Sequence, residues 1–217
     1  MSDSKVYVVD DDESFLRAVS RLLRLSGFQV VNYNSATEFL SQLDPAAVGC
    51  VVADLQMPGM DGMALQAALQ QTDNPLPVIF LTGRGDIPTS VRAMRQGAED
   101  FLTKDAPKED LIGAVQRALA RDAQERAQRA RSATLRQRFE LLSARELEVL
   151  KHVMRGRLNK QIANDLGIHE RTVKLHRTAI TTKLGVHSVA ELTKLWMEAG
   201  VSGKDTPNLS VLCRERP

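Results

Sequence analysis

Short apolar runs and longer amphipathic stretches alternate along the first half of the chain. Each run is rich in valine, isoleucine, leucine or phenylalanine, which is typical of buried strands. The stretches between them carry apolar residues at helical spacing, as Phe15, Val19 and Leu22 do after the first run. This alternation predicts an α/β fold with a doubly wound, five-stranded parallel sheet. The expected strands are residues 5–9, 28–33, 48–53, 77–81 and 100–103.

Two helices of this half have distinctive starts. Ser35 and Glu38 have the spacing of a capping box, in which a hydroxyl and a carboxylate each accept a backbone amide proton. Pro107 opens a helix that meets no further proline before about Arg138 and becomes rich in alanine and arginine. We interpret residues 122–140 as a helical interdomain linker that continues this helix. The alternative is a disordered basic linker.

Beyond the linker the pattern changes to short helices without strands. Ser143 and Glu146 again have capping-box spacing, and Asn159 and Ser188 are expected to cap two of the following helices. Apolar residues recur at helical spacing in each of these segments. The sequence therefore predicts a second, all-α domain of four helices.

Charge supports the division into two domains. Residues 1–120 contain 10 basic and 16 acidic side chains, a balance of −6, whereas residues 121–217 contain 19 and 11, a balance of +8. An acidic half suits a metal ion and a basic half suits nucleic acid. The alternative is that the basic surface only keeps the protein in solution.

Cysteine usage and hydropathy bear on the compartment. Cys50 and Cys213 lie far apart without metal-ligand spacing, so neither a disulfide framework nor a cysteine metal site is expected. The N-terminal residues lack the pattern of a signal peptide, and no apolar run approaches the roughly 18 residues of a membrane helix. We expect a cytoplasmic protein without a membrane partner.

Four of the predicted strands end on residues that handle metal ions or phosphate. Asp10 and Asp11 follow the first strand, Asp54 the third, Thr82 the fourth and Lys104 the fifth. The carboxyl ends of parallel strands share one edge of a sheet, so these side chains should converge there. Adjacent carboxylates favour a hard cation such as Mg²⁺, and a carboxylate can also accept a phosphoryl group. Taken singly, each residue also has an ordinary interpretation, as a solvated turn aspartate, a threonine at a strand end or an exposed lysine. Their shared position at strand ends supports the functional interpretation.

The segments VVDDDE, DLQMPGMDG, LTGRGDIP and GAEDFLTK resemble the receiver domain of bacterial two-component response regulators, whose fold is flavodoxin-like. The resemblance implies phosphorylation of Asp54 and a Mg²⁺ site formed by Asp10, Asp11, Asp54 and the backbone carbonyl of Gln56. It also implies phosphate-stabilising and switch residues, namely Thr82, Lys104 and Phe101.

In that family the positions of Gln56 and Arg84 tune the lifetime of the phosphoryl group. One departure from the pattern follows Lys104, where Asp105 stands in place of the proline that many receivers have. This departure weakens the expectation of a cis peptide bond at that position.

The segment from LSARELEVL to TTKLGV resembles the LuxR-type helix-turn-helix domain of the NarL/FixJ response regulators. The resemblance implies a recognition helix that enters the major groove of double-stranded DNA. The alternative for any one of these residues is a solvated helix face. The implied DNA-binding residues are Lys174, Leu175, Thr178, Arg171, Arg177, Lys160 and Lys183, of which the last two are expected to contact the DNA backbone.

Together these features predict a response regulator that a sensor histidine kinase phosphorylates. We expect a receiver domain over 1–121, the linker over 122–140, the DNA-binding domain over 141–204 and a flexible tail over 205–217. The resemblance implies that the phosphorylated protein forms a homodimer, binds DNA, works with RNA polymerase and regulates transcription. It would not be an enzyme beyond self-phosphorylation from a phosphodonor and autodephosphorylation.

Two other functions fit parts of the sequence. One is a Mg²⁺-dependent phosphohydrolase of the haloacid dehalogenase type, with Asp10 as nucleophile and Asp12 as general acid, because such enzymes also begin with a strand followed by Asp-x-Asp. The first half has no room for the substrate cap of those enzymes. The other is a regulator that acts unphosphorylated through protein contacts alone.

Overall fold

The computed structural model describes residues 4–83 and 87–200. The chain divides into two compact units, Met1–Arg126 and Ala127–Pro217. The predicted tail over 205–217 lies outside the described residues. Within the described part of the chain, no helix is both long and apolar enough to cross a membrane.

The first unit is built on one parallel sheet of five strands in the order β2-β1-β3-β4-β5. Strand order reverses between β1 and β3, which pair directly although β2 lies between them in the sequence. Ligands bind at such reversals, outside the carboxyl ends of the strands. The predicted fold class is therefore confirmed for this unit. The strands are β1 (Lys5–Val9), β2 (Gln29–Tyr33), β3 (Gly49–Ala53), β4 (Val78–Thr82) and β5 (Asp100–Thr103).

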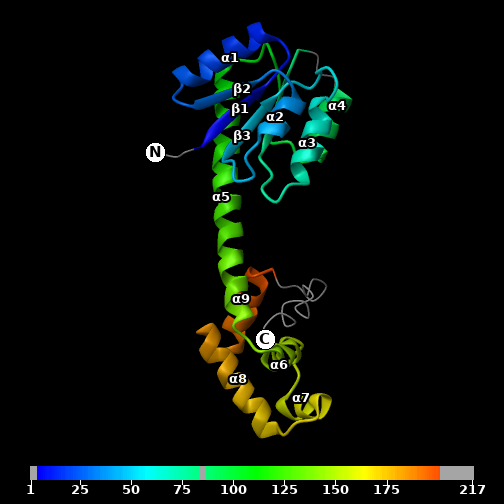
Figure 1. Cartoon of the computed structure of the whole chain (residues 1–217), viewed down its shortest axis with the longest axis vertical. Helices are drawn as coiled ribbons and strands as arrows, with labels where there is room; N and C mark the ends of the chain where they lie inside the picture. The colour runs from blue at the N-terminus through cyan, green and yellow to red at the C-terminus, as the bar shows by residue number, and fades with distance from the viewer. Residues whose placement is uncertain (1–3, 84–86, 201–217) are drawn as a thin grey trace. The chain divides into compact units, whose positions relative to one another are not determined.

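Helices cover both faces of this sheet, and each face has its own apolar core. Phe39, Leu65 and Phe80 belong to the core beneath α2, α3 and α4, which Figure 1 shows together on one side of the sheet. Leu23 and Val115 belong to the core on the other face, beneath α1 and α5. The helices are α1 (Glu13–Leu25), α2 (Ala36–Gln42), α3 (Gly62–Gln70), α4 (Ile87–Arg95) and α5 (Lys108–Glu140).

The start of α2 differs in one detail from the predicted capping box. The Ser35 hydroxyl accepts the Glu38 amide proton at 3.2 Å, as expected. The Glu38 carboxylate, however, accepts the amide proton of Asn34 at 3.1 Å rather than that of Ser35. Half of the predicted capping box is therefore present, and the glutamate satisfies the neighbouring amide instead.

Helix α5 is tied to the first unit by a buried carboxylate. Asp122 is 1% exposed, and its Oδ2 atom accepts hydrogen bonds from the Gly49 amide at 3.1 Å and the Arg126 Nε atom at 2.9 Å. Gly49 has a φ of +139°, and a Cβ atom there would lie 1.8 Å from the Lys5 carbonyl oxygen, so only glycine fits this start of β3. Asp122 and Arg126 lie in the range expected to be the interdomain linker, and these contacts attach them to the first unit.

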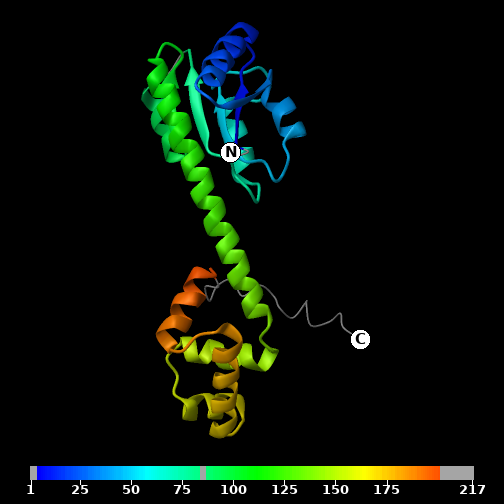
Figure 2. The same cartoon turned by 90° about the vertical axis from the view of Figure 1, so that its left-hand side faces the viewer.

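The second unit is all helical over its described residues, as the sequence predicts. Four helices follow α5 in the described residues, and Figure 2 shows them gathered at the C-terminal end of α5. Leu135 and Phe139 of α5 belong to the apolar core of this unit, and the Phe139 ring meets the Trp196 ring edge-on at a centroid distance of 5.4 Å. The helices are α6 (Ala144–Met154), α7 (Asn159–Leu166), α8 (Glu170–Leu184) and α9 (Val189–Glu198).

Two of the three helix caps predicted for this unit are confirmed. The capping box of Ser143 and Glu146 at the start of α6 is present, and the Ser188 side chain caps α9. The prediction that Asn159 caps the next helix is wrong, because Asn159 is the first residue of α7 and Leu158 occupies the cap position. The Asn159 side chain is instead used in a contact with α8, described below.

Candidate functional site

Three carboxylates converge at the carboxyl edge of the sheet. Asp10 and Asp11 follow β1, and Asp54 follows β3, the strand paired with it. One oxygen from each of the three carboxylates lies within 4.8 Å of the others. Asp10 and Asp54 are buried, whereas Asp11 is exposed. The convergence predicted from strand order is therefore confirmed.

Lys104 bridges the two buried carboxylates. Its Nζ atom lies 2.5 Å from Oδ2 of Asp10 and 2.9 Å from Oδ2 of Asp54. The Oδ1 atoms of the two aspartates accept backbone amide protons, from Asp12 at 2.9 Å and from Gln56 at 3.3 Å. Each buried carboxylate is thus oriented by the residue two positions later in its own loop, and both present their second oxygen to one ammonium.

Burial and charge act in opposite directions on these groups. Burial raises the pKa of Asp10 above its usual value, because lost hydration outweighs the hydrogen bonds from Lys104 and Asp12. For Lys104, burial acts to lower the pKa, but the two carboxylates raise it further than burial lowers it. The ammonium is therefore charged at neutral pH and partly compensates the acidic cluster.

A glycine allows the β3–α3 loop to lie close against the end of β3, beside the acidic cluster. A Cβ atom on Gly62 would lie 2.4 Å from the carbonyl oxygen of Asp54 and 2.9 Å from the Phe80 ring. The Gly62 amide also donates to the Leu55 carbonyl at 3.0 Å. The loop after Asp54 can therefore fold back under the strand only with glycine here.

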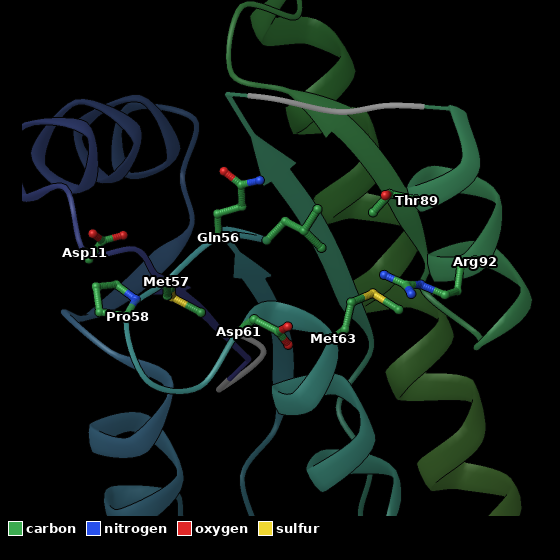
Figure 3. A pocket seen from close by; sticks show the side chains of 9 residues that line it. Asp11, Gln56, Met57, Pro58, Asp61, Met63, Thr89 and Arg92 are labelled. Atoms are coloured by element: carbon green, nitrogen blue, oxygen red, sulfur yellow. The ribbon is translucent and has the colours of Figure 1, made fainter.

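A groove of about 570 Å³ lies beside the acidic cluster, between this loop and α4. Figure 3 shows Asp11 at one end of the groove and Arg92 of α4 at the other, with Met57 and Met63 between them. Gln56 also lines it. The space next to the carboxylates is therefore open to molecules larger than an ion.

In the second unit, some side chains of α8 are exposed to solvent and others form contacts within the domain. Lys174 and Leu175 are 65% and 63% exposed, the lysine as a side chain and the leucine as a whole residue. Arg177 is partly buried and donates to the Asn159 side chain at 2.9 Å. Lys183 forms an ion pair with the buried Glu146 at 2.7 Å.

Comparison with known proteins accounts for both units. Residues 6–116 match the response regulator receiver domain family, and residues 140–196 match the luxR family of bacterial regulatory proteins. The response regulator protein TodT of Pseudomonas putida is 43% identical over 197 residues, which cover 90% of this chain and 87% of TodT. The transcriptional regulatory protein FixJ of Azorhizobium caulinodans is 38% identical over 200 residues, 92% of this chain and 95% of FixJ.

The chain belongs to the NarL/FixJ family of response regulators. Solved structures agree with this assignment. The response regulator StyR is similar with a TM-score of 0.73 and 42% identity, over 91% of this chain and 100% of StyR. Full-length FixJ from B. japonicum has a TM-score of 0.56 and 33% identity, over 94% of this chain and 100% of FixJ.

The protein is thus a two-component response regulator, with an aspartate site in its receiver domain and a LuxR-type DNA-binding domain that regulates transcription. Proteins of this family are typically not enzymes apart from the phosphoryl chemistry of the receiver. This membership supersedes the phosphohydrolase alternative.

Thr82 and Phe101, to which the resemblance assigns a switch role, lie on the neighbouring strands β4 and β5. Thr82 is 1% exposed at the end of β4 and lies next to Lys104, whose amide donates to the Thr82 carbonyl at 2.8 Å. Phe101 of β5 is partly buried and packs against the core, with its ring centroid 6.2 Å from that of Phe80. Arg84 lies outside the described residues.

In the DNA-binding domain the structure separates the predicted contacts into two groups. Lys160, Arg171, Lys174, Leu175 and Thr178 are exposed. Arg177 is partly buried and bonded to Asn159, whereas Lys183 is exposed but forms an ion pair with Glu146. The roles of all seven in DNA binding remain predictions.

Sequence reasoning missed two residues that shape the receiver site. Gly62 has no predicted role, although a glycine at the start of a helix after this loop is a signal of a close backbone approach. The helical spacing of Phe15 predicts only that it faces the core, but its ring centre lies 4.2 Å from the Lys104 Nζ atom. An aromatic residue in the first helical turn after an acidic pair was the available signal.

Proposed function

We propose that Asp54 accepts a phosphoryl group from a sensor histidine kinase and that this modification controls DNA binding. The observation that carries the proposal is the meeting of three carboxylates and one ammonium within a single site. Asp54 presents its Oδ2 atom toward Lys104, so an attacking oxygen of Asp54 lies beside a cation that would neutralise the incoming phosphoryl oxygens.

The same residues fit a divalent cation. Three carboxylates face one ammonium, and hard cations such as Mg²⁺ prefer oxygen ligands. We propose Mg²⁺, held by Asp10, Asp11, Asp54 and the backbone carbonyl of Gln56. Bound there, the metal would neutralise charge on the phosphoryl group during transfer.

The chain's own residues supply the remaining steps. An Asp54 carboxylate oxygen attacks phosphorus, and the bond from phosphorus to the donor breaks with its electron pair leaving on the donor. Lys104 and the Thr82 hydroxyl then hydrogen-bond phosphoryl oxygens, and Phe101 changes position with Thr82. In the second domain, α8 enters the major groove of DNA, with Lys174, Leu175 and Thr178 facing the bases and Arg171, Arg177, Lys160 and Lys183 supporting them.

Substitution of the acceptor tests this proposal. We expect Asp54→Asn to abolish phosphoryl transfer while the fold is retained, because the amide has nearly the same shape but is a poor nucleophile. Intact-mass analysis after incubation with acetyl phosphate and Mg²⁺ measures the adduct. Asp73→Asn is the matched control, since Asp73 is an exposed aspartate of the same domain.

The same experiment distinguishes the proposal from the remaining alternative, a regulator that acts without phosphorylation. An undiminished adduct on Asp54→Asn would contradict the assignment of the acceptor. If wild-type protein forms the adduct but its DNA affinity does not change, the protein acts through unphosphorylated contacts, and only the regulatory part of the proposal fails.

A further inference from the structure

The Lys104 ammonium has a third neighbour besides its two carboxylates. Its Nζ atom lies over the ring of Phe15, 4.2 Å from the ring centre. Cations within about 6 Å of an aromatic centroid are attracted by the negative face of the ring. Phe15 therefore binds the ammonium from the side of α1, while Asp10 and Asp54 bind it from the strand ends.

The position of the Phe15 ring is linked to the acidic cluster through the backbone. The Asp12 amide donates to Oδ1 of Asp10 at 2.9 Å, and the Asp12 carboxylate in turn accepts the Phe15 amide proton at 3.1 Å. The ring also packs against the apolar core that α1 shares with the sheet. The first turn of α1 thus holds the ring at a fixed place relative to Asp10.

The three neighbours of the ammonium differ in chemistry. In the proposed function, the Asp10 carboxylate is a ligand of the metal, and Asp54 is both a ligand of the metal and the carrier of the phosphoryl group. An aromatic face neither binds the metal nor carries the phosphoryl group. The contact between Phe15 and the ammonium can therefore persist throughout the reaction.

We propose that Phe15 is a positioning residue for phosphoryl transfer. Its ring holds the Lys104 ammonium at the edge of the site while the carboxylate partners of Lys104 are taken up by the metal and the phosphoryl group. The proposal rests on the proposed phosphorylation of Asp54. Phe15 does not touch the reacting atoms itself and acts only through Lys104.

The chain offers a control that separates this role from packing. Phe28 is also a partly buried phenylalanine packed against the same core, and among the residues that the structure describes no lysine forms a cation–π contact with its ring. Phe28→Leu therefore removes the same atoms from the same core without changing the surroundings of Lys104. Phe15→Tyr retains the ring face and should behave like wild type.

Kinetics of the full chain with acetyl phosphate and saturating Mg²⁺ test the proposal. We expect Phe15→Leu to lower the phosphorylation rate constant about two- to fivefold, the range that one partly exposed cation–π contact covers. Phe15→Tyr and Phe28→Leu should leave it unchanged. In a Lys104→Met background, Phe15→Leu should have no further effect, because the cation it positions is gone.

A second measurement does not depend on phosphorylation. In protein with ¹³C-labelled lysine, the ε-methylene signal of Lys104, assigned as the one missing from Lys104→Met, should be shifted upfield by the ring current of Phe15. The shift should disappear in Phe15→Leu and persist in Phe15→Tyr and Phe28→Leu.

Either measurement can overturn the inference. A Lys104 signal that is the same in wild type and Phe15→Leu would show that the ring does not hold the ammonium. Equal slowing by Phe15→Leu with and without Lys104 would show that Phe15 acts through packing alone. If wild type accepts no phosphoryl group, the proposed function fails, whereas the lysine signal still decides whether Phe15 holds Lys104.

Discussion

Lys174 and Arg177 lie one turn apart on α8 but have different surroundings. The Lys174 side chain is 65% exposed, and its ion pair is with Glu170 of the same helix at 3.6 Å. Such a pair contributes little in solvent. Arg177 instead joins α8 to Asn159 at the start of α7, so it helps to fix the angle between the two helices of the helix-turn-helix.

We therefore expect Lys174→Ala and Arg177→Ala to have different consequences. Lys174→Ala should weaken operator binding by about 1 to 3 kcal/mol and leave stability unchanged, as for loss of a base contact. Arg177→Ala should lower the free energy of unfolding by about 1 kcal/mol, the net value of one hydrogen bond, and weaken binding to all sequences alike. Calorimetric melting and salt titrations on specific and random duplexes measure both effects.

Asn159→Ala is the control for the second part of this prediction. If the contact between Arg177 and Asn159 is what matters, this variant should reproduce the loss of stability seen with Arg177→Ala. Wild-type affinity of both α8 variants across the salt range would show that this face of α8 does not read DNA.

The end of α5 serves as a cap for two helices of the DNA-binding domain. Arg138 donates to the carbonyl of Leu184, the last residue of α8, and Arg136 donates to the carbonyl of Ala199, just after α9, at 2.8 Å. The Ser132 hydroxyl adds a bond to the Glu198 carbonyl at 2.9 Å. The last carbonyls of a helix have no partner within it, and cationic donors also suit the negative end of its dipole.

This arrangement predicts the outcome of truncation. A fragment of residues 127–204 should fold, whereas the range expected from the sequence, 141–204, should be largely unfolded. The shorter fragment loses these caps and the buried side chains of Leu135 and Phe139, which are worth about 1.5 to 3 kcal/mol each. Urea denaturation followed by circular dichroism measures the difference.

A point variant separates the lost contacts from the change in length. Phe139→Ala in the longer fragment should cost about 3 to 5 kcal/mol. If residues 141–204 fold as stably as the longer fragment, the second half of α5 is a linker and not part of the domain.

The sequence predicted the elements of the receiver closely, and the reason is local. Strands β1 and β5 begin and end at the expected residues, and the other strands differ by one residue at their ends. Buried runs of β-branched and aromatic residues between turn formers determine a strand within a few positions. The order of strand ends was then enough to predict that Asp10, Asp54 and Lys104 meet.

What the sequence did not predict depends on contacts between distant residues. The hydrogen bond from Gly49 to Asp122 joins residues 73 positions apart, and the bond from Arg138 to Leu184 spans 46 positions. No local pattern distinguishes these side chains from others on a polar helix. For this reason the sequence of the arginine-rich part of α5 indicates a helical linker and nothing about the contacts it makes.

For the whole molecule, the exposed apolar residues of α4 suggest how copies associate. Ile87, Val91 and Met94 are 80%, 43% and 45% exposed and follow the spacing of one helix face. A row of apolar side chains in solvent is typical of an interaction surface. We propose that phosphorylation favours a homodimer and that this row of side chains belongs to its interface, since α4 follows β4, which ends at Thr82.

Phosphorylation should therefore raise the dimer fraction, and Val91→Asp should reduce this gain. A carboxylate buried in an apolar interface costs about 1 to 3 kcal/mol or more, so dimer affinity should fall at least about fivefold. Sedimentation velocity with and without acetyl phosphate and Mg²⁺ measures the effect. Leu25→Asp is the control, because Leu25 is 78% exposed at the end of α1. If both variants dimerise equally, the α4 face is not part of the dimer interface.

The aromatic residues of the two units have a practical consequence for spectroscopy. The chain has one tryptophan and two tyrosines. Tyr7 and Tyr33 both lie in the receiver core around Phe39, whereas Trp196 lies against Phe139 in the DNA-binding unit. Light at the red edge of the absorption band excites tryptophan alone, so its fluorescence reports on the DNA-binding unit of the intact chain. The regulator thus carries a native optical probe of one domain that needs no label.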